Sequence, residues 1–475
     1  MMAAEDTNAV NNTRSTTIVV GLGKTGLSCA RYLAQQGKSF VVVDSRPEPP
    51  CLKQLLNVAP NVECYFGKFD PFVFEQAKSI IVSPGISIKE SVIANAMAEG
   101  VEIKGDIALF AEHADAPIVA ITGSNGKSTV TTLVGEMALQ CNVDVKVGGN
   151  LGVPALDLLT KKDGEPLAAL NGRTEKKAPA YYVLELSSFQ LETTPDLHAY
   201  TAVVLNVSAD HMDRYSNLQE YIDAKAKIYT NCRNIIFNRD DPLVVAMIKT
   251  VDTGNANSVI SFGLDMPPAE HDYGIAFYEE QSWLVKGGQR LIPVDDILLP
   301  GRHNQANALA ALALGETMGL DIKSMLSVLY DFAGLPHRMQ LVATTNDVQW
   351  FNDSKGTNVG ATVSAISGMP GDKILIAGGD GKGADFEPLR EAVIANNVRL
   401  VILIGKDAKR IEQVLTGVVK IERAANMFAA VKIANKYAKP QEKVILSPAC
   451  ASFDMFNDYQ HRGEVFMEAI RNLPL

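Results

Sequence analysis

The chain has 475 residues, 47% of them apolar and 21% charged, a composition typical of globular proteins. This excludes a single small module, a globally disordered chain and a fibrous repeat, and it predicts about three domains. Asp and Glu outnumber Lys and Arg by 54 to 44, so the net charge of −10 argues against broad binding to nucleic acid or anionic membranes. Any anionic ligand must therefore bind at a local site.

The cysteines and the amino terminus indicate the cellular compartment. The six cysteines form no C-x-x-C pair, which favours reduced thiols over disulfides or a zinc site. Residues 1–14 are polar and predict a disordered tail, the amino-terminal stretch has no apolar h-region, and nowhere do 18 apolar residues run together. We therefore expect a soluble cytoplasmic protein, a monomer by default, with no nucleic-acid or membrane partner.

The first part of the chain, residues 15–108, alternates short β-branched runs with a helical pattern. Strands are predicted over 16–23, 39–44 and 79–85, and an amphipathic helix closed by Gly37 lies between the first two. This alternation is typical of parallel sheets covered by helices. The segment is therefore predicted to form a compact Rossmann-like α/β domain.

Two further α/β domains are predicted, over 109–334 and 335–475, with a boundary near GLPHR. Charged residues 160–180 are interpreted as a surface insertion within the central domain. The expected strands of both domains are PIVAITGS, VKVGGN, YYVLELSS, AVVLNVS, QWFNDS, KILIAGGDG, LVILIG and KVILSPA. The expected fold class is thus α/β throughout, with three parallel sheets.

The strongest chemical signal is a glycine-rich loop between an apolar strand and a helix that begins near Lys127. It consists of Gly123, Ser124, Asn125, Gly126, Lys127, Ser128 and Thr129. In a P-loop the backbone N–H groups and the helix N-terminus bind phosphate oxygens, the lysine reaches the terminal phosphates and the hydroxyl holds Mg²⁺. The loop is two residues shorter than G-x-x-x-x-G-K-[ST], so it is a variant. A plain turn before a helix is the alternative, which both flanks disfavour.

Polar residues follow two later strands of the same predicted domain. Glu185 ends one strand, where it is either a magnesium ligand beside the phosphate loop or a structural carboxylate. Asp210, His211 and Asp213 follow the next, at the sheet edge where α/β sites gather. A lone histidine is usually structural, but the neighbouring carboxylates and the phosphate loop favour a functional one here.

Lys225 lies on the apolar stripe of a helix predicted in LQEYIDAKAKIY, whereas Lys227 lies off it. Burying a lysine costs free energy unless the amine is paired, neutral or chemically modified. A lysine that snorkels from the edge of the stripe is the alternative. Lys225 is therefore a candidate for chemistry.

In the first predicted domain, Gly21, Gly23 and Gly26 satisfy G-x-G-x-x-G after a strand, and Asp44 ends the next strand. The pattern predicts a glycine turn and helix N-terminus for a diphosphate, with an acid for a sugar or base. The segment Ser83-Pro84-Gly85 is a second candidate wall for that ligand. A nicotinamide dehydrogenase would explain this pattern but would leave the phosphate loop without a role.

The third predicted domain has two lysine-bearing loops after strands, DSKGTN from Asp353 and GGDGKG from Gly378. Either loop alone is as often only a turn, but together they predict a cleft between domains that handles several anionic groups. Asn304 is expected to cap the helix of the apolar run ALAALAL. Asn307 is either functional or an ordinary residue of the first turn.

Taken together, GSNGKST, LELSSFQL, NVSADHMDRY with Lys225, GRHNQANALAAL, LPHRM, FNDSKGTN, GGDGKGADF and SPACASFDMF resemble the Mur ligases of bacterial peptidoglycan synthesis. The resemblance covers nearly the whole chain after the tail, and the short P-loop is the form that this family uses. It implies a UDP-sugar domain, a central ATPase domain and a C-terminal amino-acid domain. The motifs are most similar to those of members that add D-glutamate to UDP-N-acetylmuramoyl-L-alanine through an acyl phosphate, giving ADP and phosphate.

The resemblance also implies roles for single residues. The phosphate loop would hold ATP, with Lys127 and Ser128 on its phosphates and further contacts from Asn307, Arg338 and Asp353. Two Mg²⁺ would be bound by Ser128, Glu185, His211 and Lys225, the last as an N-carboxylated carbamate. The UDP substrate would be bound by Gly23, Lys24, Thr25, Asp44, Ser45, Arg46, Ser83, Gly85 and Asn150. D-Glutamate would be held by Thr357, Lys382, Ser452, Phe453 and Tyr459, where the tyrosine replaces an expected phenylalanine.

Alternatives to this assignment are a non-enzymatic nucleotide switch and a sibling ligase with another amine substrate. A switch would bind nucleotide without needing an amino acid for turnover. Siblings add L-alanine, a diamino acid or a dipeptide, or extend folate with glutamate, and the Asn-Pro-Arg signature of the diaminopimelate-adding sibling is absent from the sequence. For the ligase we expect the C-terminal domain to close over the central one and exclude water.

Overall fold

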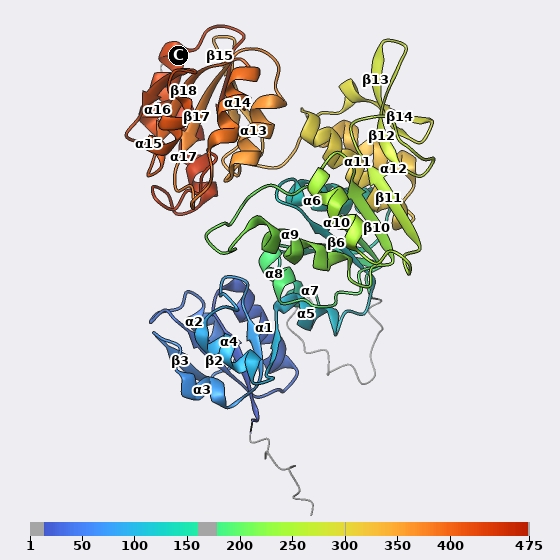
Figure 1. Cartoon of the computed structure of the whole chain (residues 1–475), viewed down its shortest axis with the longest axis vertical. Coiled ribbons are helices and arrows are strands. Elements are labelled where there is room, and N and C mark those ends of the chain that lie inside the picture. Colours follow the sequence, from blue (N-terminus) through green and yellow to red (C-terminus); the bar gives the residue numbers. More distant parts are fainter. Residues whose placement is uncertain (1–13, 160–177, 300, 474–475) are drawn as a thin grey trace, which may run out of the picture. The chain divides into compact units, whose positions relative to one another are not determined.

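The computed structural model describes residues 14–159, 178–299 and 301–473, which form three β-sheets flanked by helices (Figure 1). Nearly all of the predicted tail 1–14 and of the predicted insertion 160–180 lies outside these residues. The chain divides into two compact units, Met1–Pro117 with Lys146–His198 and Ile118–Val145 with Ala199–Leu475. Within the described ranges, no helix has the length and apolar character that a membrane span requires.

The first sheet is five-stranded and parallel, in the order β3-β2-β1-β4-β5. Its elements, drawn from blue to cyan and teal in Figure 1, are β1 (Thr16–Val20), α1 (Lys24–Gln35), β2 (Phe40–Asp44), α2 (Leu52–Val58), β3 (Glu63–Phe66), α3 (Pro71–Glu75), β4 (Ala77–Val82), α4 (Ser91–Ala98), β5 (Glu102–Lys104) and α5 (Asp106–Ala111). The central strands are almost wholly apolar because helices cover both faces. This order confirms the predicted Rossmann-like arrangement and places the strand-order reversal between β1 and β4, where ligands of such sheets bind.

The second unit contains seven strands of the central sheet, in the order β14-β13-β12-β11-β10-β9-β6. The strands are β6 (Ile118–Thr122), β9 (Thr201–Val204), β10 (Asn234–Asn238), β11 (Ser258–Phe262), β12 (Tyr273–Tyr278), β13 (Gln281–Lys286) and β14 (Gln289–Pro293). The helices are α6 (Lys127–Gln140), α9 (Leu218–Ala226), η2 (Lys227–Tyr229), α10 (Pro242–Thr250), η3 (Val294–Asp296), α11 (Arg302–Thr317) and α12 (Ile322–Asp331). Strands β6, β9, β10 and β11 are parallel, so their carboxyl ends share one edge. Of these, β6 and β9 were predicted from the sequence, whereas β10 and β11 were not.

Strands β7 (Val145–Gly149) and β8 (Tyr181–Glu185) are neighbours of each other, with α7 (Ala155–Leu158) and α8 (Ser188–Glu192) beside them in the sequence. Helix α8 begins with a capping box, in which the Ser187 side chain and Gln190 satisfy each other's backbone N–H groups. The N-cap Ser187 lies two residues after Glu185, the last residue of β8, so the box fixes the direction in which the chain leaves the strand.

Two sets of antiparallel strands differ from the prediction of purely parallel sheets. Strands β12, β13 and β14 form consecutive hairpins, and β15 (Gln340–Thr345) pairs antiparallel with β16 (Val348–Asn352). Hairpins need only two-residue turns, here Glu279-Glu280 with φ of 50° and 65°, and Gly287-Gly288. The Gly-Gly pair between two alternating runs was the sequence signal for this meander.

The third sheet has the order β15-β16-β20-β17-β18-β19, with every neighbouring pair except β15 and β16 parallel. Its remaining elements are α13 (Val359–Ser367), β17 (Lys373–Gly378), α14 (Glu387–Ala395), β18 (Val398–Ile404), α15 (Ala408–Leu415), β19 (Lys420–Arg423), α16 (Met427–Tyr437), β20 (Lys443–Leu446) and α17 (Tyr459–Arg471). Apolar clusters cover both faces of the sheet. The four predicted strands are confirmed, and the loops after them open at one edge.

The expected cap of the helix over the run ALAALAL is wrong. Helix α11 begins at Arg302, with Gly301 as its N-cap at a φ of 99°, so Asn304 lies inside the first turn. The helix begins before the expected cap because its N-cap position needs a positive φ, which glycine takes without strain. Asn304 is thereby turned inward, where its side chain accepts a hydrogen bond from Asn307 at 3.1 Å.

Gly26 provides a test of the packing in the first sheet. A Cβ at Gly26 would lie 1.8 Å from the carbonyl oxygen of Gly21, whereas a Cβ at Gly23 would meet nothing within 4 Å. We expect Gly26→Ala to lower the free energy of unfolding of this unit by about 3 kcal/mol, the upper range for overpacking. Gly23→Ala is the matched control. Equal thermal midpoints for the two variants would contradict the prediction.

Candidate active site

The phosphate loop between β6 and α6 is held by the segment that follows β9. The Asn206 side chain accepts a hydrogen bond from the N–H of Asn125 at 2.8 Å and donates one to the Asn125 carbonyl at 3.1 Å. The Asn206 carbonyl accepts from the N–H of Ser124 at 2.9 Å, and the Ser124 hydroxyl lies 3.0 Å from that of Tyr221. Three backbone groups of the loop are therefore fixed by one residue outside the motif.

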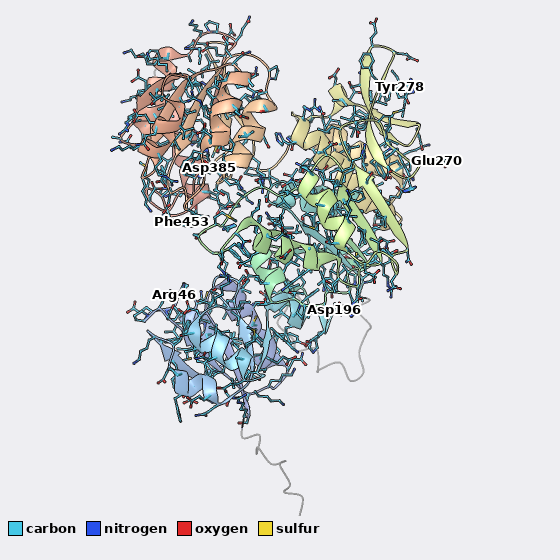
Figure 2. The ribbon with its side chains drawn as sticks, in the orientation of Figure 1. Arg46, Asp196, Glu270, Tyr278, Asp385 and Phe453 are labelled. Carbon is cyan, nitrogen blue, oxygen red and sulfur yellow. The ribbon has the colours of Figure 1, made fainter. Side chains whose placement is uncertain are left out.

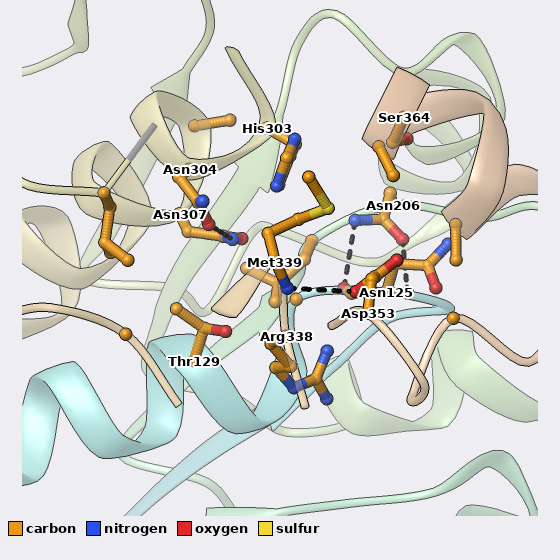
Figure 3. A pocket seen from close by; sticks show the side chains of 18 of the residues that line it. Asn125, Thr129, Asn206, His303, Asn304, Asn307, Arg338, Met339, Asp353 and Ser364 are labelled. Carbon is orange, nitrogen blue, oxygen red and sulfur yellow. Dashed lines mark hydrogen bonds between the residues drawn. The ribbon is translucent and has the colours of Figure 1, made fainter. Parts of the chain in front are cut away.

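Six of the ten predicted nucleotide residues line one cavity of about 190 Å³, whereas Gly123, Ser124, Lys127 and Ser128 do not line it (Figure 3). Its wall includes residues from the phosphate loop, the first turns of α11 and the segment after α12. The predicted members among them are Asn125, Gly126, Thr129, Asn307, Arg338 and Asp353. Gly126 has a φ of 83°, and a Cβ there would lie 2.4 Å from the side-chain oxygen of Asn307. Glycine is therefore required at this contact.

Cationic groups surround the loop. The Ser128 hydroxyl is contacted at 3.0 Å by both the Arg338 guanidinium and the Lys355 amine. The Lys127 amine donates to the carbonyls of Gly123 and Ser124 at 2.7 and 3.0 Å. Together these charges favour an anion, and a polyphosphate on the loop would replace such internal contacts with charge-assisted hydrogen bonds.

Two titratable groups line the same cavity, Asp353, which is buried, and His303, which is half-buried. Burial raises the pKa of Asp353 to about 6, although a hydrogen bond from the Ser447 hydroxyl at 2.7 Å and the charge of Arg338 act against the increase. Burial lowers the pKa of His303 to about 4, and the positive charge of Arg338 lowers it further. His303 is therefore neutral at physiological pH, which leaves Arg338 and Lys355 as the nearby cations.

A second cavity of about 410 Å³ brings together residues of the central and third sheets. Asp210, His211, Thr357 and Lys382 line it, two from each segment. Burial lowers the pKa of His211, Asp210 opposes this, and the charges of Lys382 and Lys127 add to it. The imidazole is thus neutral, the form that binds metals. Among the described residues that form this wall, Ser452, Phe453 and Tyr459 are absent.

These three residues lie elsewhere on the third sheet's loops. Ser452 is buried, and Phe453 is 73% exposed (Figure 2). The Tyr459 ring opens α17, with its centroid 5.2 Å from the Lys355 amine. The geometry thus separates the five predicted D-glutamate residues into a pair at the second cavity and a trio outside it.

Lys225 is 1% exposed, as its position on the apolar stripe predicted. Its amine donates to the carbonyl of Gly123 at 3.0 Å and to the hydroxyl of Thr122 at 3.4 Å, and lies 4.6 Å from the Tyr221 ring centroid. Lys225 therefore sits beneath the phosphate loop, which a lysine snorkelling to the surface would not reach.

The first unit gathers its predicted residues at the carboxyl ends of β1, β2 and β4. The Asp44 carboxylate accepts from the N–H of Leu22 at 2.7 Å and from the Arg46 guanidinium. Burial opposes ionisation of Asp44, but these hydrogen bonds outweigh it and lower the pKa. The Ser83 hydroxyl donates to the Gly21 carbonyl at 2.9 Å. The remaining members, Gly23, Lys24, Thr25, Ser45, Arg46 and Gly85, are half-buried or exposed around this turn, and Figure 2 labels Arg46.

Glu185 and Asn150 form a separate pair in the first unit. The Asn150 side chain donates to the Glu185 carboxylate at 2.7 Å, and its N–H donates to the Glu185 carbonyl at 2.8 Å. Glu185 is 2% exposed. The pair shows how a strand-end carboxylate is held in one orientation. Across the described ranges, no group of three or more His, Cys, Asp or Glu side chains is placed to hold a metal ion by itself.

Sequence reasoning gave no role to Asn206, His303 and Arg462, and it singled out Lys355 only as the lysine of a loop expected to handle anionic groups. Arg462 is fully buried in α17, where its guanidinium donates to the Ser354 hydroxyl and carbonyl and to the Cys450 carbonyl. Burial lowers the pKa of Arg462 to about 10. An arginine on the apolar face of a helix was the available signal. Asn206, His303 and Lys355 lie within the sequence motifs of the resemblance, but the residues that they contact come from distant segments of the chain.

Family models match most of the chain. The Mur ligase MurD-like N-terminal domain matches residues 15–105, the Mur ligase middle domain 121–315, and the Mur ligase glutamate ligase domain 337–450. Three similar proteins are each named UDP-N-acetylmuramoylalanine--D-glutamate ligase. They come from Nitrosococcus oceani (48% identity, covering 97% of both chains), Marinobacter nauticus (49%, covering 96% and 98%) and Legionella pneumophila strain Paris (46%, covering 96% and 99%).

Solved structures are similar in fold at low identity. A UDP-N-acetylmuramate-alanine ligase from Thermotoga maritima aligns with a TM-score of 0.58 and 18% identity over 96% of this chain and 99% of its own. A pseudomurein peptide ligase type C from Methanothermus fervidus aligns with a TM-score of 0.56 and 17% identity over 96% and 100%. At these identities the similarity concerns the fold alone.

Asn206 gives the test of this geometry. Asn206→Ala removes both side-chain hydrogen bonds to the half-buried Asn125, and each such hydrogen bond contributes about 0.5–1.5 kcal/mol. We expect the affinity for ADP, measured by titration calorimetry, to fall about tenfold. The thermal midpoint of the variant serves as the control for general destabilisation. An affinity within twofold of that of the unaltered protein would contradict the prediction.

Proposed function

The chain belongs to the Mur ligase family, and from this premise we propose that it is the ATP-dependent ligase that adds D-glutamate to UDP-N-acetylmuramoyl-L-alanine in peptidoglycan precursor synthesis. The observation that carries this proposal is near-half identity, over almost the full length, to ligases of that name. The cavity that joins the phosphate loop to Arg338, Asp353 and Lys355 supports the use of ATP.

The reaction has two steps. The L-alanine carboxylate of the UDP substrate attacks the γ-phosphorus of ATP, the bond to the β-phosphate oxygen breaks, and ADP leaves behind an acyl phosphate. The D-glutamate amine then attacks the acyl carbon, loses a proton and expels phosphate, which leaves an amide. Lys127, Arg338 and Lys355 surround the phosphate loop, so their charges stabilise negative charge on the transferring phosphoryl group.

Two Mg²⁺ ions are part of the proposal, held by Ser128, Glu185, His211 and a modified Lys225. The donor chemistry fits: hydroxyl and carboxylate oxygens are the ligands that Mg²⁺ prefers, and the Asn150 amide orients Glu185 as a partner of a metal ligand would. When bound, Mg²⁺ offsets phosphate charge and aligns the phosphates. The neutral imidazole of His211 is available for coordination because burial and nearby lysines lower its pKa.

The modification proposed for Lys225 is an N-carboxylate formed from the neutral amine and CO2, with loss of one proton. Burial favours the neutral amine that this reaction needs. The contacts that support the proposal are the carbonyl of Gly123 and the hydroxyl of Thr122, since both place the amine directly under the phosphate loop. The carbamate would replace a buried cation with an anion that can bind a metal.

The substrates are assigned to three domains, 15–108 for the UDP substrate, 109–334 for ATP and 335–475 for D-glutamate. The turn after β1, with Asp44 and Ser83, supports the first assignment. Lys382 and Thr357 at the second cavity support binding of a carboxylate. In this proposal Ser452, Phe453 and Tyr459 approach D-glutamate when the C-terminal domain closes over the central one.

The protein is proposed to work as a cytoplasmic monomer. The six cysteines are all free thiols, and four of them are buried. Unpaired buried thiols suit a reducing compartment, where ATP is also supplied.

Amine specificity tests the proposed function. Phosphate release from ATP, with Mg²⁺ and UDP-N-acetylmuramoyl-L-alanine present, is expected with D-glutamate and not with L-glutamate, L-alanine or diaminopimelate. Lys382→Ala should raise the KM for D-glutamate about tenfold or more, because one charge-assisted hydrogen bond to a carboxylate is lost. Turnover with a different amine would leave the ATP site in place but reject the D-glutamate assignment. No turnover with any amine would favour a nucleotide-binding switch.

The proposed carbamate has a direct spectroscopic test. With ¹³C-labelled bicarbonate, the protein should show a carbamate carbonyl resonance that Lys225→Arg abolishes. Lys227→Arg is the matched control, since Lys227 follows α9 and is only half-buried. Lys225→Arg should also lower kcat about 100-fold or more, because a cation would occupy the place of an anionic ligand. A resonance that survives in Lys225→Arg would reject the modification at this position.

A further inference from the structure

Asn358 lies where three segments of the site meet. It follows Thr357 in the loop after β16 and is the N-cap of α13, and its side chain is 6% exposed. Its side-chain oxygen accepts a hydrogen bond from the N–H of Ala361 at 2.8 Å, which caps the helix. Because that bond requires the oxygen on this side, the orientation of the amide is settled and its nitrogen must point the other way.

The amide nitrogen makes contacts that capping does not require. It donates to the Asp210 carboxylate at 2.9 Å and to the side-chain oxygen of Asn125 at 3.2 Å. Asn125 belongs to the phosphate loop, and Asp210 precedes His211. Serine or aspartate would cap α13 equally well, and neither has the amide nitrogen. The contacts of this nitrogen therefore have a role other than capping the helix.

The fit around this contact is close. A Cβ at Gly360, in the first turn of α13, would lie 2.8 Å from the hydroxyl of Ser208 in the segment that leads to Asp210. The Asp210 carboxylate also accepts from the N–H of His211 at 2.9 Å and lies 3.7 Å from its imidazole nitrogen. The hydrogen bond from Asn358 therefore helps to decide how Asp210 is turned toward His211.

We propose that Asn358 is a positioning residue for the ligase reaction, which ties the loop carrying Thr357 to the phosphate loop and to Asp210 so that the acyl phosphate and the incoming amine are aligned. This inference rests on the proposed function. It assigns this task mainly to the amide nitrogen, because the oxygen caps the helix and accepts only a longer hydrogen bond from the Asn125 side chain, at 3.5 Å. Alignment of two reactants within one site acts mainly on kcat, since it lowers the entropic part of the barrier.

Asn358→Ser tests the inference, since it keeps the cap and removes the donor without adding charge. We expect kcat to fall about tenfold, as for one hydrogen bond to a charged group, with the KM for the UDP substrate changed less than twofold. Asn426→Ser is the matched control, because Asn426 caps α16 by accepting from the N–H of Ala429 and is exposed. That control should retain full kcat, and both variants should keep their thermal midpoints.

A second measurement separates the contact with Asp210 from other effects. In a double-mutant cycle, Asp210→Asn should lower kcat less in the Asn358→Ser background than in the unaltered protein, because the hydrogen bond is already lost. Additive effects would reject this contact, and a kcat for Asn358→Ser within twofold of the unaltered protein would overturn the inference. All ratios are taken with whichever amine supports turnover, so a wrong amine assignment and a wrong role for Asn358 give different results.

Discussion

The two hydrogen bonds between the Asn206 side chain and the backbone of Asn125 determine the shape of the phosphate loop. A loop this short has few internal hydrogen bonds, so its N–H groups must be oriented from outside. Asn206 can do this because β6 and β9 are adjacent parallel strands whose carboxyl ends lie together. The strand order of the sheet therefore sets the position of the loop, of the start of α6 and of the cationic groups around Ser128.

Charge around this loop is arranged so that a polyphosphate meets cations and few competing anions. Arg338 and Lys355 reach Ser128, and burial keeps His303 neutral. Asp353 is the competing anion, because a pKa raised to about 6 still leaves it mostly ionised at neutral pH. The protein carries net negative charge, so attraction of an anionic substrate has to come from this local arrangement. Lys225 lies directly beneath the loop, where its buried amine contacts the carbonyl of Gly123, the hydroxyl of Thr122 and the ring of Tyr221.

The third sheet contributes to the same site because the carboxyl ends of its parallel strands also lie at one edge. Its parallel strands end at one edge, so the loops that carry Lys355, Asn358 and Lys382 approach the central sheet together. The buried guanidinium of Arg462 holds the loop that carries Lys355 in place by hydrogen bonds to Ser354 and to the Cys450 carbonyl. A residue with a structural task in one domain, such as the helix cap Asn358, can thereby act on the chemistry of another.

The sequence by itself determined the α/β class, the phosphate loop, the glycine turn before α1 and the burial of Lys225, because each follows from local spacing or helical periodicity. It did not reveal the β12–β14 meander, since short hairpins leave only a turn signal, or the start of α11, which depends on the backbone of Gly301. Only the tertiary structure decided that Asn206 holds the loop and that Asn358 reaches Asp210. It also showed that Thr357 and Lys382 share a cavity that Ser452, Phe453 and Tyr459 do not line. The physical reason is that hydrogen bonds and cavities join residues many positions apart, and their pairing is set by strand order, which local sequence patterns do not encode.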